Sequence, residues 1–67
     1  MKYTVKNEQE TDGRWIAEIE DLPGVLAYGT TKEEAVTKAE ALALRVVADK
    51  IEHGETSLNS VISFIAS

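Results

Sequence analysis

The feature that most constrains this chain is the start of a long helix at residues 29–35, Gly-Thr-Thr-Lys-Glu-Glu-Ala. Thr31 and Glu34 have the S/T-x-x-E spacing of a capping box, in which the threonine oxygen accepts the N–H of the third helical residue and the glutamate reaches back to the N-cap N–H. Apolar residues then recur at helical spacing, without glycine or proline, until Gly54, a residue type common just after a helix. The pattern predicts one helix from residue 32 to about residue 53, ~22 residues and ~33 Å long. All other elements must pack against it.

Three segments with strand patterns precede this helix. Residues 1–7 and 14–20 alternate apolar and polar side chains, and Asp12-Gly13 between them is a strong hairpin turn. Asp21-Leu22-Pro23-Gly24 ends the second strand, because proline cannot donate to a ladder, and residues 25–28 follow as a short third strand. After the helix, residues 58–65 read as a fourth strand with apolar side chains on both faces, which predicts burial on both sides.

This order of elements predicts an α+β fold, β-β-β-α-β. A right-handed crossover brings the fourth strand parallel to the first, so we expect a four-stranded mixed sheet of order 3-2-1-4 with the helix on one face. The side chains expected under the helix are Tyr3, Val5, Trp15, Ala17 and Ile19.

The same arrangement predicts self-association. Ile16 would face water on the other side of the sheet, and the fourth strand would be an open edge with apolar side chains, which proteins usually cover. We therefore expect a homo-oligomer, a dimer or a tetramer. Ala41, Leu44 and Ala48 lie outside the main apolar stripe of the helix and are candidates for contact with another copy.

Composition limits the classes of partner. The 67 residues include twelve Asp and Glu against seven Lys and Arg, a net charge of −5, and the basic residues are scattered singly. Direct binding of nucleic acid is therefore not expected, whereas an acidic chain suits a basic protein partner. There is no cysteine, so disulfides, thiolate zinc sites and cysteine nucleophiles are excluded. Without a signal-peptide pattern or a long apolar stretch, we expect a cytoplasmic protein with no membrane segment.

Four features occur in a fixed order along the chain: Tyr3, the hairpin Asp12-Gly13-Arg14-Trp15-Ile16-Ala17-Glu18-Ile19, the turn Asp21-Leu22-Pro23-Gly24, and the helix start at residues 29–35. Together they resemble the HicB-like antitoxin domain, over essentially the whole chain. The resemblance implies a partly degraded RNase H-like fold and a toxin–antitoxin role, in which the domain binds and blocks HicA, a small basic mRNA-cleaving toxin. Many members continue into a DNA-binding segment. Here we expect a single HicB-like domain, residues 1–67, with no C-terminal DNA-binding domain.

An RNase H-like relationship raises the question of metal-dependent catalysis. Such enzymes need clustered carboxylates from the first strand, the helix and the fourth strand to hold two Mg²⁺ ions. Residues 1–7 contain no Asp or Glu and residues 58–65 offer only Asn59, so Glu40 of the helix would stand alone. The single histidine, His53, is expected to interact with the negative end of the helix dipole. We expect no catalytic, cofactor-binding or metal-binding residues; a residual metal-dependent nuclease is an alternative.

The candidate residues for partner binding lie around the end of the second strand and the third strand. Glu18, Glu20 and Asp21 would form an acidic rim that pairs with Lys or Arg of a basic partner; a solvated strand end is the simpler interpretation. Pro23 and Gly24 form a prominent turn, and Tyr28 is expected to be half exposed. The hypothesis is a non-catalytic binding module that forms homo-oligomers and neutralises a small basic toxin. The alternative is an orphan domain that associates only with itself.

Overall fold

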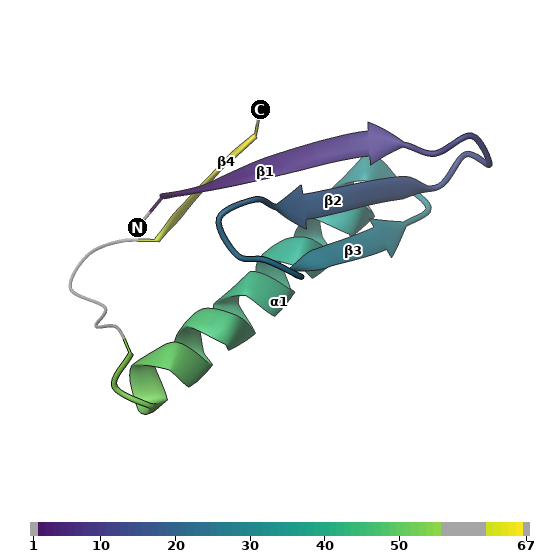
Figure 1. The fold of residues 1–67 in the computed structure, drawn as a ribbon. Coiled ribbons are helices and arrows are strands. Elements are labelled where there is room, and N and C mark those ends of the chain that lie inside the picture. Colours follow the sequence, from purple (N-terminus) through teal and green to yellow (C-terminus); the bar gives the residue numbers. More distant parts are fainter. Residues whose placement is uncertain (1, 56–61, 67) are drawn as a thin grey trace.

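The computed structural model describes residues 2–55 and 62–66. Along this part of the chain the elements are β1 (Lys2–Gln9), β2 (Trp15–Ile19), β3 (Leu26–Gly29), α1 (Lys32–Glu52) and β4 (Ser63–Ala66). The sheet has the order β3-β2-β1-β4; β1–β2 and β2–β3 are antiparallel and β1–β4 is parallel (Figure 1). The predicted α+β fold, its strand order and its single long helix are confirmed.

The ends of α1 follow from local hydrogen bonds. Thr31 is the N-cap, and its Oγ1 accepts the Glu34 N–H at 3.1 Å. The Glu34 carboxylate accepts the N–H of Thr30 at 2.9 Å, one residue before the N-cap N–H that a capping box predicts. At the other end, the N–H groups of Gly54 and Glu55 donate to the carbonyls of Ile51 and Lys50, the two bonds of a Schellman motif. Gly54 has the positive φ of 72° that this motif favours in glycine.

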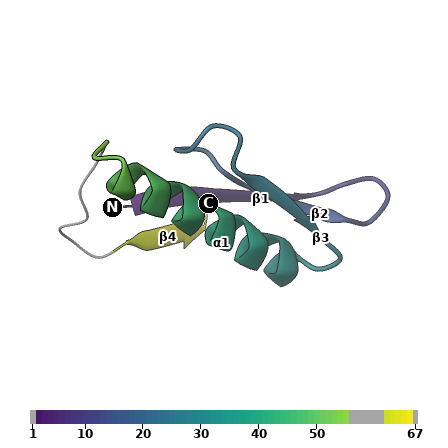
Figure 2. The same ribbon diagram turned by 90° about the horizontal axis from the view of Figure 1, so that it is seen from below.

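The core lies between α1 and one face of the sheet. The buried side of α1 is made mostly of alanines, and it packs mainly on β2 and β3 and less on β1. Figure 2, the view from below, shows α1 running diagonally across the strands. The buried core consists of Val5, Ala17, Ile19, Leu22, Val25, Ala35, Ala39, Ala43 and Val47. Within the described residues, no helix has both the length and the apolar character needed to cross a membrane.

The hairpin between β1 and β2 is longer than predicted. β1 continues to Gln9, because the pairing goes on through Glu8↔Ile16 and Gln9↔Trp15. Beyond the strands, the Glu10 N–H donates to the Arg14 carbonyl at 2.7 Å. The predicted turn at Asp12-Gly13 therefore lies at the tip, where the Asp12 carboxylate accepts the Arg14 N–H.

The last strand differs from its prediction. Residues 58–61 lie outside the described part of the chain, Ile62 precedes the strand, and β4 begins at Ser63. Phe64 pairs with Tyr3 of β1, and the two rings lie 5.8 Å apart. Burial on both faces is wrong at Ile65, which is 49% exposed, because the single helix covers only one side of the sheet.

Gly29, at the end of β3, lies against the backbone at the start of α1. A Cβ at this position would lie 2.6 Å from the Ala35 nitrogen and 3.0 Å from the Thr31 carbonyl oxygen, and these backbone atoms cannot move aside as a flexible side chain can. We expect Gly29→Ala to lower the free energy of unfolding by about 1–3 kcal/mol, measured by urea denaturation. Thr30→Ala, at the exposed next position, keeps the backbone N–H that Glu34 accepts and should change stability by less than about 0.5 kcal/mol. Equal losses in the two variants would contradict this account.

Glu34, at the start of α1, makes the stability of the fold depend on pH. Its pKa is lowered, chiefly because the carboxylate accepts the Thr30 N–H and further because Lys38 lies beside it. Folding thus favours the charged form, so its stabilisation is complete above the ordinary carboxyl pKa and is lost as the pH falls through the lowered one. Glu34→Gln keeps an acceptor but does not titrate, so the loss of stability in acid should be shallower in this variant. Urea denaturation of both proteins across the acid range measures this difference, and parallel curves would contradict it.

Candidate functional site

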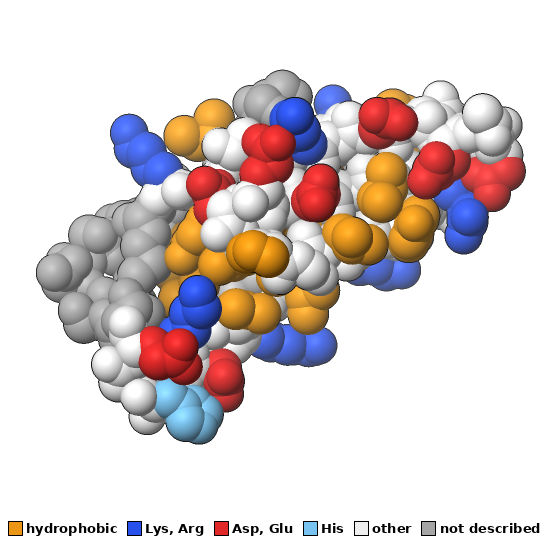
Figure 3. All heavy atoms as spheres, in the orientation of Figure 1, with side chains coloured by type: hydrophobic (Ala, Val, Ile, Leu, Met, Phe, Trp, Pro, Cys, Tyr) orange, Lys and Arg blue, Asp and Glu red, His pale blue; other side chains and the backbone are white. Residues whose placement is uncertain are grey.

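The face of the sheet opposite α1 carries a mixture of acidic and apolar side chains. Cross-strand pairs on this face join Lys6 to Glu18 and Glu8 to Ile16, and then Ile16 to Tyr28 and Glu18 to Leu26. In Figure 3, apolar side chains gather over β2 and β3 and acidic side chains border them. We call Ile16, Leu26 and Tyr28 the outer apolar patch; Leu26 is 38% and Tyr28 is 43% exposed.

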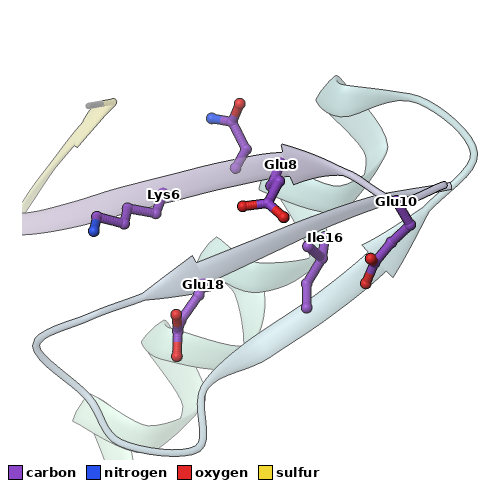
Figure 4. A pocket seen from close by; sticks show the side chains of 6 residues that line it. Lys6, Glu8, Glu10, Ile16 and Glu18 are labelled. Atoms are coloured by element: carbon purple, nitrogen blue, oxygen red, sulfur yellow. The ribbon is translucent and has the colours of Figure 1, made fainter. Parts of the chain in front are cut away.

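An open hollow of about 530 Å³ lies beside this patch, over β1, β2 and the start of the hairpin loop. Figure 4 shows the side chains of Glu8, Ile16 and Glu18 on the two neighbouring strands, with Glu10 where the hairpin loop begins. The lining residues, which define what we call the carboxylate hollow, are Lys6, Asn7, Glu8, Glu10, Ile16 and Glu18.

The charge of the carboxylate hollow is unbalanced. Among the described residues that line it, Lys6 is the only basic one, and the Lys6 Nζ lies 3.0 Å from the Glu20 carboxylate. That hydrogen bond, the charge of Glu20 and, to a smaller extent, the charge of Glu18 raise the pKa of Lys6. Within the described residues, Glu8, Glu10 and Glu18 form no salt bridge. The hollow therefore presents three carboxylates around one apolar side chain, an arrangement suited to a basic ligand.

Arg14 contacts the outer apolar patch at Tyr28. Its guanidinium carbon lies 5.0 Å from the centre of the Tyr28 ring, within the range of a cation–π contact. Its Nε lies 2.9 Å from the Asp12 carboxylate, and the Arg14 backbone N–H is the main cause of the lowered pKa of Asp12. The hairpin tip thus holds Arg14 over Tyr28.

The structure separates the predicted partner-binding residues into two groups. Glu18 and Tyr28 lie on the helix-free face, over the middle of the strands. The other four, Glu20, Asp21, Pro23 and Gly24, are exposed around the turn between β2 and β3.

Asp21 has a local role at this turn. Its Oδ2 accepts the Thr4 N–H at 2.7 Å, while the Thr4 carbonyl accepts the Glu20 N–H at 3.2 Å. The carboxylate of Asp21 therefore supplies an acceptor at the end of the β1–β2 ladder.

Sequence reasoning missed Glu8, Glu10 and Ile16 as members of one site. It ended the first strand at Asn7, because the alternation of apolar and polar side chains stops after Lys6 and the next residues are all polar. The premise that the first strand has no carboxylate is therefore wrong, since Glu8 belongs to β1.

Glu40 and Asn59 are the residues that the sequence offered for a metal site. Glu40 is half-buried on α1, and Asn59 lies outside the described part of the chain. Residues 2–55 and 62–66 contain no group of three or more His, Cys, Asp or Glu side chains placed to hold a metal ion.

Comparison of the chain with models of protein families, with curated proteins and with solved structures finds no match.

Because Asp21 accepts a backbone hydrogen bond and, among the described residues, Glu18 does not, we expect substitutions at these two positions to differ in their effect on stability. Asp21→Ala removes the acceptor of the Thr4 N–H and should lower the free energy of unfolding by about 1 kcal/mol. Glu18→Ala removes an exposed carboxylate without a salt bridge and should change it by less than about 0.5 kcal/mol. Urea denaturation of both variants checks this, and the reverse order of stabilities would refute the role given to Asp21.

Proposed function

We propose that this chain is a non-catalytic protein-binding module, resembling a HicB-type antitoxin, that binds and neutralises a small basic mRNA-cleaving toxin. The observation that carries the proposal is the carboxylate hollow, where Glu8, Glu10 and Glu18 surround Ile16 without salt bridges within the described residues. The net charge of −5 and the ordered motifs that resemble the HicB-like domain support the same assignment.

The chemistry of the hollow favours a lysine or arginine side chain of the partner. The aliphatic part of such a side chain packs on Ile16, and its charged end forms charge-assisted hydrogen bonds with the carboxylates. Several of these contacts on one open face suit a protein surface better than a small ligand. Attraction between an acidic face and a basic protein also speeds their encounter, and added salt weakens this effect.

The proposal places the protein in the cytoplasm, where mRNA is cleaved. It assigns no direct contact with nucleic acid, because Lys and Arg are scattered singly along the chain. The RNase H-like relationship implied by the motifs belongs to the same proposal.

The first test is identification of the partner. The tagged chain, purified from its own cells, should carry a small basic protein in a fixed molar ratio, measured by light scattering and mass spectrometry. That protein, produced separately, should cleave mRNA, and addition of this chain should stop the cleavage. Recovery of the chain with no such partner would favour the alternative, a domain that associates only with itself.

The second test locates the binding face. The double variant Glu8→Gln/Glu18→Gln removes two carboxylates of the hollow and should raise the dissociation constant for the toxin about tenfold or more. The matched control, Glu52→Gln/Glu55→Gln, removes the same charge at the far end of α1 and should bind as the unchanged chain does. Titration calorimetry measures both. Equal weakening by the two variants would show that net charge, not the hollow, governs binding.

A further inference from the structure

β3 is an edge strand whose outer backbone groups have a definite direction. The Ile19 N–H donates to the Val25 carbonyl at 3.0 Å, so Ile19 and Val25 form a hydrogen-bonded pair. Such pairs alternate along an antiparallel ladder, so Ala27 and Gly29 also turn their backbone groups towards β2. The N–H and C=O groups of Leu26 and Tyr28 therefore point away from the sheet. Among the described strands, none pairs with this side of β3 (Figure 1).

This edge lacks most of the features that keep edge strands apart. Residues 22–31 contain no charged side chain, and Pro23 lies before the strand rather than in it. Lysine, proline within the strand and bulges are the usual protections, and a short length is the one that β3 has. Two of the most exposed large apolar side chains of the described residues, Leu26 and Tyr28, belong to this strand.

We propose that β3 pairs with β3 of a second copy of this chain, antiparallel, about a two-fold axis at Ala27. In this register Leu26 of one copy forms a hydrogen-bonded pair with Tyr28 of the other, and the symmetry repeats the pair. Ala27 lies opposite its own counterpart in a non-hydrogen-bonded pair. The outward backbone groups of Leu26 and Tyr28 are all satisfied, and the two sheets become one continuous sheet with both carboxylate hollows on the same face.

The side chains on the helix-free face fit this register. Across the junction, the row from one copy to the next reads Ile16, Tyr28, then Leu26 and Glu18 of the second copy. Apolar side chains thus meet at the junction, and no like charges lie opposite each other.

A second copy suits this edge better than the basic partner does. The carboxylates that attract a basic protein lie in the hollow over β1 and β2, whereas β3 itself is uncharged. Self-pairing needs only the strand, its own symmetry and the outer apolar patch. Pairing through β3 therefore does not require the proposed toxin.

The register can be tested by cross-linking, because the chain contains no cysteine of its own. Ala27→Cys places two thiols in a non-hydrogen-bonded pair, with the Cα atoms ~4.5 Å apart, which is within the range of a disulfide. A mild oxidant should convert this variant largely to a covalent dimer. Leu26→Cys sets its two thiols on diagonal positions, ~8 Å apart by strand spacing and residue rise, so it should remain mostly uncross-linked. Cross-linking of Leu26→Cys but not of Ala27→Cys would overturn the register.

The interface can be tested by mass measurement in solution. The unchanged chain should sediment as a dimer that dissociates on dilution. Leu26→Lys places a charge on the edge, yet its cross-strand neighbour Glu18 keeps it compatible with the folded monomer. Its dimer dissociation constant should rise about tenfold or more, because symmetry removes the Leu26–Tyr28 pair twice.

Leu44→Lys is the matched control. Leu44 is 45% exposed and belongs to α1 rather than to β3, so its substitution leaves the paired strand unchanged and this variant should dimerise as the unchanged chain does. A chain that is monomeric at ~1 mM, far above the dissociation constants of specific dimers, would overturn the proposal. Loss of the dimer in Leu44→Lys but not in Leu26→Lys would overturn it as well and assign the interface to the helix.

Discussion

The close packing of α1 on β2 and β3 is the contact on which the rest of the structure depends. The side chains that face the sheet from α1 are Ala35, Ala39, Ala43 and Val47, and all four are buried. Small side chains bring the helix near to the strands, and Gly29 lets the chain enter the helix directly from β3. A small domain buries only ~60% of the surface of its unfolded chain, so a continuous contact of this kind carries most of its core.

One helix covers one side of the sheet and leaves the other side to water. The consequence appears on the strands themselves, where alternate residues differ in burial. Ala17 and Ile19 are fully buried under α1, whereas Glu18 between them is exposed beside Ile16. The helix-free face is thus the face of the sheet that a partner can contact. This face has two regions of different chemistry. One is the carboxylate hollow around Ile16, over β1 and β2, and the other is β3, an uncharged strand at the edge of the sheet.

These two regions suit different kinds of contact. A carboxylate hollow recognises positive charge, and it acts at long range before contact is made. An edge strand recognises another strand through backbone hydrogen bonds, which form only at contact and in a fixed register. Because the regions adjoin along β2, a dimer formed through β3 would present two hollows on one face. A partner with two basic segments would then bind both.

Much of the fold was predictable because the signals were local. The capping residues Thr31 and Glu34, the turn at Asp12-Gly13 and the alternation of side chains on the strands each depend on residues close in the sequence. The strand order followed from the handedness of the crossover. Errors appeared where local signals were weak, at the end of β1 and in β4. Part of the predicted fourth strand lies outside the described residues, and Ile65 is exposed although an apolar pattern suggested burial.

The sequence by itself determined the elements, their order and the acidic character of the chain, since these depend on composition and on neighbours along the chain. Only the tertiary structure decided that Glu8 and Glu10 join Glu18 around Ile16, and that Asp21 caps a ladder. The physical reason is the register of β1 against β2, because a shift of one residue would turn every side chain of a strand to the opposite face. Register also decides which backbone groups of β3 point outward. Both candidate surfaces therefore come from strand pairing and not from any single motif.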